Sequence, residues 1–276
     1  MESSQRINKR ARMNKIRKYL CAALLMLIGC FVSRGQFWDS SSGLLQAPSA
    51  DMHKNGTFTI TNNILNKHSI SDWYWGYNTF AYSIGINLWG RVEIGYVCVL
   101  LNGSKNPTQQ DSYYYRIMHN QDRHFNAKAL LLREGDCGIS WLPALAIGFS
   151  DPTTHNGNDY IDQDVKGEGN GFFNRYYAVA TKHFDTKYGM VGAHLGYQFN
   201  QRTDFPMNGP CAAIDWVPVW LNKPNFTLKA IAEYDSRTFN VGFIASIWKE
   251  HFDVMFELMA MKWINFGVRY KLQLKS

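Results

Sequence analysis

Two carboxylates in the C-terminal third of the chain have a spacing that could support acid–base chemistry. Glu233 and Asp235 lie two residues apart in an alternating segment, so in a strand they would share one face about 7 Å apart. Paired carboxylates can hydrolyse a glycosidic bond. Acids that line a pore and pair with Lys or Arg on neighbouring strands have the same spacing, and Lys128 is a candidate partner. We favour this structural pairing.

Other residues that could carry chemistry do not form a recognised motif. The eight histidines lack the H-x-H or H-x-x-x-H spacing suited to zinc. Asp159, Asp162 and Asp164 resemble a calcium loop only loosely, because their positions miss the EF-hand spacing. Neither a G-x-S-x-G sequence nor a P-loop occurs. We therefore expect no catalytic residue, no metal centre and no cofactor.

The net charge of +7 belongs to the N-terminal leader. Eight of the 29 basic residues and one of the 22 acidic residues lie within residues 1–35, so the rest of the chain carries equal numbers of each. Without a basic face, nucleic-acid binding loses its main support. A hydrophobic content of 46% and a charged content of 18% exclude a disordered chain.

Residues 1–35 are predicted to be a signal peptide, and residues 36–276 the mature domain. A basic stretch precedes an apolar run from Tyr19 to Val32, followed by a short exit near Gly35. A membrane anchor is the alternative, but the run is shorter than the ~20 residues that a spanning helix needs. Leu27–Cys30 also resembles a lipobox, so lipidation at Cys30 is a second, less favoured alternative.

The mature chain repeats one pattern, in which apolar and polar residues alternate over about ten positions between turn residues. Such alternation predicts β-strands, and no helical periodicity competes with it outside the leader. We expect about 12 strands in an all-β fold. The predicted segments are residues 56–63, 78–88, 91–101, 125–133, 142–149, 174–184, 188–199, 210–220, 226–234, 239–247, 252–261 and 264–274.

Strand length favours a closed antiparallel transmembrane β-barrel. Segments of this length match the 9–11 residues that cross a bilayer at a tilt, whereas strands of soluble sheets are most often ~5–6 residues long. The polar series would face the lumen and the aromatic and aliphatic series would face lipid. Because alternation alone does not tell inside from outside, a soluble barrel with an apolar interior is the alternative. Tryptophans near predicted strand ends would form an aromatic girdle: Trp73, Trp75, Trp89, Trp248 and Trp263.

Four motifs resemble, in order, those of the YjbH-like family of outer-membrane exopolysaccharide biosynthesis proteins. They are GLLQAPSA at 43–50 with Gly56 after it, DRHFNAK at 122–128 with LPALAIGFSD at 142–151, YAVATK at 177–182, and AEYD at 232–235. The positions that carry the likeness are Asp122, Lys128, Pro143, Gly148, Asp151, Lys182, Glu233 and Asp235. Many members of the family are much longer, whereas this chain has room for one barrel.

The resemblance implies an outer-membrane β-barrel in a Gram-negative bacterium, acting in exopolysaccharide biosynthesis or export without catalysis. Its partners would be outer-membrane lipid, the extracellular polysaccharide and other export components. A lumen charge cluster would hold its shape, formed by Lys128, Glu233, Asp235 and Arg269. Two alternatives stay open: an outer-membrane enzyme acting on lipid or glycan, and a secreted soluble β-barrel that binds carbohydrate.

Overall fold

The computed structural model describes residues 36–69, 78–101, 120–152, 173–200 and 207–274, which all belong to one compact unit, Ser33–Ser276. The predicted signal peptide and Cys30 lie outside these residues, as do Trp73, Trp75 and the acidic stretch with Asp159, Asp162 and Asp164. No helix among the described residues is long and apolar enough to cross a membrane.

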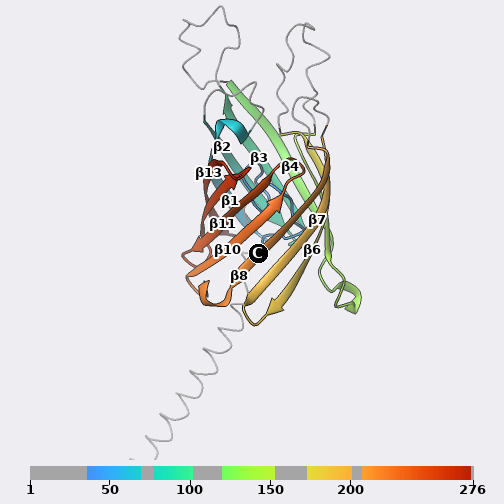
Figure 1. Ribbon diagram of the computed structural model, residues 1–276. Coiled ribbons are helices and arrows are strands. Elements are labelled where there is room, and N and C mark those ends of the chain that lie inside the picture. Colours follow the sequence, from blue (N-terminus) through green and yellow to red (C-terminus); the bar gives the residue numbers. More distant parts are fainter. Residues whose placement is uncertain (1–35, 70–77, 102–119, 153–172, 201–206, 275–276) are drawn as a thin grey trace, which may run out of the picture. The chain divides into compact units, whose positions relative to one another are not determined.

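The described chain forms one antiparallel sheet that closes on itself (Figure 1). Each long strand pairs with its neighbour in sequence, and the last pairs with the first, as Thr57 opposite Gln273 and Ile64 opposite Phe266 show. A two-residue strand, β9, lies beside β10 and leaves a barrel of 12 long strands, which confirms the predicted fold class. The strands are β1 (Thr57–Leu65), β2 (Thr79–Leu88), β3 (Val92–Leu101), β4 (Asn120–Leu132), β5 (Ala144–Ser150), β6 (Arg175–Thr186), β7 (Gly189–Phe199), β8 (Gly209–Pro218), β9 (Asn222–Lys223), β10 (Phe226–Tyr234), β11 (Phe239–Ile247), β12 (Phe252–Met259) and β13 (Trp263–Gln273). Three short 3-10 helices lie between strands: η1 (Lys67–Ser69), η4 (Asp136–Gly138) and η6 (Val219–Leu221).

The outer wall of the barrel is apolar and the inner wall is charged. Leu195 and Phe239 are 64% and 68% exposed on the outside, whereas Lys229, Asp253 and Arg269 are fully buried inside. In water this arrangement would expose large apolar side chains around the whole circumference, whereas in a bilayer they face lipid. The protein is therefore a membrane β-barrel, and the soluble alternative with an apolar interior is wrong.

Exposed aromatic residues gather at the end of the barrel where the connections are short. Because the strands alternate in direction, the β2–β3, β4–β5, β6–β7, β8–β10 and β11–β12 connections all lie at this end. Each of them carries an exposed ring, namely Trp89, Trp141, Tyr188, Trp220 and Trp248. Aromatic rings at this level are typical of a membrane interface. The girdle prediction thus holds for Trp89 and Trp248.

The start of the strand predicted at residues 125–133 needs correction. Asp122 does not end a strand, because β4 begins at Asn120 and Asp122 pairs with Val99 of β3. The polar residues around Asp122 suggested a loop. In the structure they nevertheless pair with β3 through their backbone, because the lumen accommodates their polar side chains. Asp151 does follow β5 directly, with a φ of 50°, and its backbone N–H donates to Phe125 at 2.8 Å.

Candidate functional site in the barrel lumen

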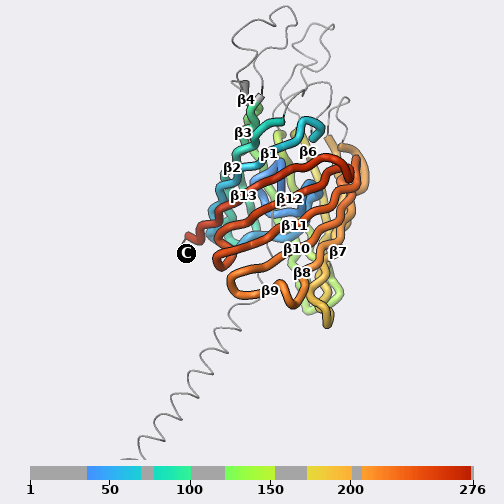
Figure 2. The backbone as a smooth tube through the Cα atoms, turned by 60° about the vertical axis from the view of Figure 1, so that its left-hand side comes forward, coloured from blue at the N-terminus to red at the C-terminus, as the bar shows by residue number. Residues whose placement is uncertain are grey.

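The lumen contains the N-terminal segment of the mature chain. Residues 36–52, here called the plug, are all buried, and Figure 2 shows this blue segment inside the ring of strands. The plug folds back on itself, since Phe37 N–H donates to Leu45 at 2.9 Å and Gly43 forms a bridge with Pro48. Its polar residues, many of them small serines, face a wall that is mostly polar, and its apolar residues are buried as well.

The apolar residues of the plug pack against small or apolar wall positions. Leu44 and Leu45 are fully buried in one cluster with Ile231, Ile244 and Met255. A Cβ at Gly242 would lie 2.0 Å from the Phe256 backbone oxygen and 3.0 Å from the Leu45 side chain, so this glycine makes room for both the neighbouring strand and the plug. Buried apolar contacts of this kind stabilise the plug by about 25 cal/mol per Å² of area removed from water.

Glu233 holds the plug by its backbone. Its carboxylate accepts hydrogen bonds from the N–H groups of Leu45, Gln46 and Ala47 at 3.0, 2.7 and 3.2 Å, and from the Asn240 amide at 3.2 Å. Two of the predicted family motifs, 187 residues apart, thus meet directly. We call this contact the Glu233 anchor.

Gln46 ties the same turn to two further wall residues. Its side-chain amide donates to Glu257 at 2.7 Å, and its backbone oxygen accepts from Arg175 at 2.8 Å. Arg175 also bonds Gln198 at 3.2 Å and Asp39 of the plug at 3.4 Å. Charged groups from β6 and β12 therefore close around one plug residue.

Glu93 and Lys128 form a second point of attachment, here called the ion-pair anchor. Lys128 Nζ lies 3.2 Å from Glu93 Oε2 and donates to the backbone oxygens of Ser42 and of Asp51, the latter at 2.5 Å. Glu93 accepts from the N–H groups of Ser42 and His53, both at 2.7 Å. The pair thus binds donors and acceptors of the plug at once.

The predicted cluster of Lys128, Glu233, Asp235 and Arg269 is not one cluster. All four are buried inside the barrel, but the expected partnership of Lys128 with Glu233 or Asp235 is wrong, because Glu93 occupies that role one strand away. Asp235 caps the β10–β11 turn, accepting from Arg237 and Thr238 N–H at 3.0 and 2.8 Å. Arg269 donates to Thr61 and contacts His53 at 3.3 Å.

Arg237 lies in the same turn and bridges it to the plug. Its guanidinium is 3.6 Å from Asp235 and 4.8 Å from the Trp38 ring. Burial lowers the pKa of Arg237, while the neighbouring Asp235 and Glu257 carboxylates oppose that change. The turn therefore covers one end of the plug with a cation stacked on an aromatic ring.

The remaining family-motif positions have structural explanations. A Cβ at Gly148 would lie 2.3 Å from the Tyr177 ring, so only glycine lets this tyrosine cover β5 from inside. Gly148 pairs with Lys128 on one side and Tyr177 on the other, which places the glycine in the row of the ion-pair anchor. Pro143 directly precedes β5, and Lys182 pairs with Glu134 at 2.8 Å in the β4–β5 connection.

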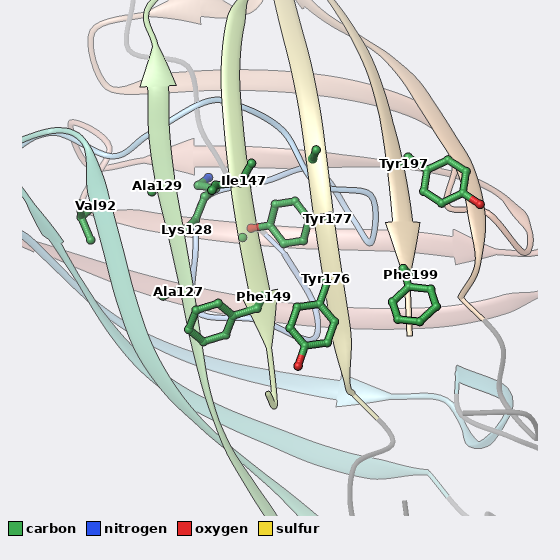
Figure 3. A pocket seen from close by; sticks show the side chains of 12 residues that line it. Val92, Ala127, Lys128, Ala129, Ile147, Phe149, Tyr176, Tyr177, Tyr197 and Phe199 are labelled. Carbon is green, nitrogen blue, oxygen red and sulfur yellow. The ribbon is translucent and has the colours of Figure 1, made fainter. Parts of the chain in front are cut away.

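The barrel wall also carries an apolar groove, which runs across β4 to β7. Phe149, Tyr176 and Phe199, from three adjacent strands, project around it in Figure 3, and Ala127 and Ala129 leave it shallow. Lys128 and Tyr177 also border the groove, but the Lys128 ammonium is engaged with the plug. Aromatic rings around small residues on a lipid-facing wall suit an acyl chain.

The family of the protein follows from its sequence over nearly the whole barrel. Residues 38–275 match the YjbH family, described as exopolysaccharide biosynthesis protein YbjH. The chain belongs to this family. The match confirms the resemblance drawn from the four motifs and links this membrane β-barrel to exopolysaccharide biosynthesis. The matched range includes both the plug from Trp38 onward and the whole barrel wall.

Solved structures share the barrel architecture at low identity. A KdgM porin in complex with disordered oligogalacturonate is 10% identical, with a TM-score of 0.43, covering 78% of this chain and 99% of the porin. LpxR from Salmonella typhimurium is 9% identical, with a TM-score of 0.39 and the same coverage. A Rhodopseudomonas blastica porin mutant is 13% identical, with a TM-score of 0.29, covering 80% and 75%. No curated protein matches the sequence. The likeness to these structures is confined to the fold.

Glu93, Arg175 and Glu257 are luminal residues that the sequence did not single out. Each lies on the buried face of its strand, so the alternation could have found them as inward charges. The sequence gives no sign that these three residues bind the plug, because most of the plug groups that they bind are backbone groups of residues 42–53. The Ser-rich stretch before the first strand was the remaining clue, and it reads equally well as a linker.

Proposed function

We propose that this protein is a non-catalytic component of exopolysaccharide export in the outer membrane of a Gram-negative bacterium. The observation that carries the proposal is the plug: a segment of the chain itself fills the lumen through hydrogen bonds that a polymer could replace. The barrel is in its closed state here, and export requires the plug to move. Residues 1–35 act as a cleaved signal peptide, and outer-membrane lipid surrounds the barrel.

The chemistry of the plug contacts supports a carbohydrate occupant. The wall presents carboxylates and cations to backbone N–H and C=O groups, and sugar hydroxyls offer the same donors and acceptors. The luminal groups Glu93, Lys128, Arg175, Glu233 and Glu257 would then exchange plug partners for hydroxyl partners. Such an exchange changes few hydrogen bonds in number, so its net cost is small.

The contacts of Glu233 and Asp235, the carboxylate pair whose spacing could also serve catalysis, support a structural role. Glu233 accepts from three plug N–H groups and one amide, and Asp235 Oδ1 accepts from two N–H groups of its own turn. Replacing both with amides should leave some polymer output. An enzyme that depends on this pair would instead lose at least 100-fold in activity while the barrel still folds.

A reversible lock on the plug tests the proposal. A Cβ at Gly85 would lie 3.1 Å from the Ser40 Cβ. The two Cβ atoms of a disulfide lie at least ~3.5 Å apart, so a small shift of a few tenths of an ångström would suffice. The double variant Ser40→Cys with Gly85→Cys should therefore cross-link the plug to the wall. Cells that rely on the double variant should show strongly reduced surface polymer when oxidised and recover it with reductant.

The single Ser40→Cys variant is the matched control and should behave like the wild type under both conditions. Heat-modifiability on gels checks that every variant forms a barrel. Wild-type polymer output from a fully cross-linked barrel would refute the requirement for plug movement. Extraction of the protein from membranes by salt alone would refute its integration in lipid.

A further inference from the structure

Three side chains from distant parts of the sequence point donor atoms at one another between plug and wall. They are Asp51 of the plug, His183 of β6 and Asp215 of β8, and one ligand atom from each lies within 4.8 Å of the others. His183 Nε2 is 3.5 Å from Asp51 Oδ1. Their side chains are 4%, 19% and 0% exposed, so the group is shielded from bulk solvent.

We propose that Asp51, His183 and Asp215 form a binding site for a divalent transition-metal ion, for which Zn²⁺ is the best fit, and that the metal fastens the plug to the wall. One imidazole nitrogen with two carboxylates is a donor set for Zn²⁺ and its neighbours, whereas Ca²⁺ and Mg²⁺ take oxygen ligands. Tetrahedral Zn²⁺ with bonds of about 2.0 Å holds its ligand atoms about 3.3 Å apart. The ligand atoms, which lie within 4.8 Å of one another, therefore need to approach by at most about 1.5 Å.

The surroundings of His183 orient it as a metal ligand. Glu134 Oε2 lies 3.0 Å from His183 Nδ1, and an ionised carboxylate can only accept, so this contact suits the tautomer that leaves Nε2 for a metal ion beside Asp51. Glu134 is itself fixed by Lys182 at 2.8 Å and by the His183 N–H at 3.2 Å. A carboxylate behind the histidine is the usual support of a metal-bound imidazole. Nε2 is buried and has no hydrogen-bond partner among the described residues.

Asp215 is held in a similar way. His194 Nε2 lies 2.8 Å from Asp215 Oδ2, and the other nitrogen of His194 is 2.9 Å from the Thr181 hydroxyl. Thr181 in turn accepts the Ala50 N–H at 2.8 Å, so the chain of bonds returns to the plug beside Asp51. The other carboxylate oxygen, Oδ1, is buried and accepts no hydrogen bond from the part of the chain that the structure describes.

Lys229 is the competing cation. Its ammonium lies 3.3 Å from Asp215 Oδ2 and 3.8 Å from Asp51 Oδ2, where it neutralises part of the negative charge. A metal ion would displace this ammonium from the carboxylates, so metal affinity is reduced by the work of moving it. Replacing Lys229 with an apolar side chain of similar length should therefore tighten metal binding. Sequence spacing could not reveal this site, because its ligands are far apart along the chain.

Calorimetric titration of the chelator-treated, folded barrel in detergent with Zn²⁺ tests the site. We expect one equivalent bound by the wild type, and binding at least 10-fold weaker in Asp215→Asn and His183→Gln. Glu134→Gln should weaken it by about 10–100-fold, because the orienting carboxylate is lost. Lys229→Met should bind more tightly than the wild type. Co²⁺ in place of Zn²⁺ should give the visible absorption of a tetrahedral site.

Asp253→Asn is the matched control, since Asp253 is a buried wall carboxylate paired with Lys271 at 2.7 Å and has no imidazole beside it among the described residues. This variant should bind Zn²⁺ like the wild type. Glu134→Gln keeps the test decisive if a buried variant fails to fold, because Glu134 lies in a partly exposed connection. Absence of stoichiometric binding by the wild type would overturn the site. Equal affinity in the wild type, His183→Gln and Asp215→Asn would overturn it too.

Discussion

The plug is held by two anchors that use charge in opposite ways. At the Glu233 anchor a carboxylate gathers three backbone N–H groups and a neutral amide. At the ion-pair anchor Glu93 and Lys128 neutralise each other and bind both kinds of backbone group. Despite this difference, both anchors bind backbone groups of the plug, so these contacts depend little on which side chains the plug carries.

Of the variants that test the two anchors, removal of Lys128 should destabilise the barrel most. Lys128→Met leaves the buried Glu93 carboxylate without its cation, which costs about 3–5 kcal/mol when a buried pair is broken from one side. We expect a loss of that size in denaturant unfolding of the barrel and release of the plug, measured as proteolysis near Ser42. The double variant Lys128→Met with Glu93→Gln should recover most of the loss. A double variant as unstable as the single one would mean that the ion pair is not the source of the cost.

Removal of the charge on Glu233 should have a smaller effect. Glu233→Gln keeps one carbonyl oxygen for the turn but turns an NH₂ group toward backbone donors, so at least one of the three N–H groups loses its acceptor, at about 1–3 kcal/mol. Hydrogen exchange should accelerate at Leu45, Gln46 and Ala47 and stay slow at Ser42. Asn240→Ala removes the side-chain donor to Glu233 and the acceptor of the Thr238 hydroxyl and the Ala260 N–H, leaves the carboxylate in place and serves as the control. Unchanged exchange at the three amides would show that the carboxylate does not hold the turn.

The smallest expected effect is at Glu134, outside both anchors. Burial raises the pKa of Glu134, but hydrogen bonds from Lys182 and His183 outweigh it, and the net pKa lies below the ordinary value of 4.5. A depressed pKa in the folded state contributes stability above the unfolded-state value, which is lost as the pH falls through the folded value. Glu134→Gln should therefore cost at most about 1 kcal/mol at neutral pH. The difference from the wild type should shrink as the pH falls through the lowered pKa of Glu134 and vanish once its carboxyl is protonated; a difference that persists in acid would contradict the assignment.

The barrel wall could be predicted from the sequence almost residue by residue. The segments 226–234 and 239–247 match β10 and β11, because strict alternation between lipid-facing and lumen-facing residues leaves no other register. The start of β4 was missed because His124 and Asp122 are polar and looked like part of a loop. Which charges pair was also missed: Lys128 meets Glu93 because β3 and β4 are neighbours, whereas β10 is several strands away around the barrel.

The amino-acid sequence by itself determined the strands, the apolar and polar faces of each strand and the family of this protein, since each depends on neighbours along the chain or on local motifs. Only the tertiary structure decided that the outer wall is the apolar one and that residues 36–52 fill the lumen. It also decided that Asp51, His183 and Asp215 converge. The physical reason is that alternation with a period of two residues assigns each side chain to one face of a strand. It does not specify whether lipid or another segment of the chain lies against that face. Closing the sheet brings residues nearly 200 positions apart within hydrogen-bonding distance, as Gln46 and Glu233 are.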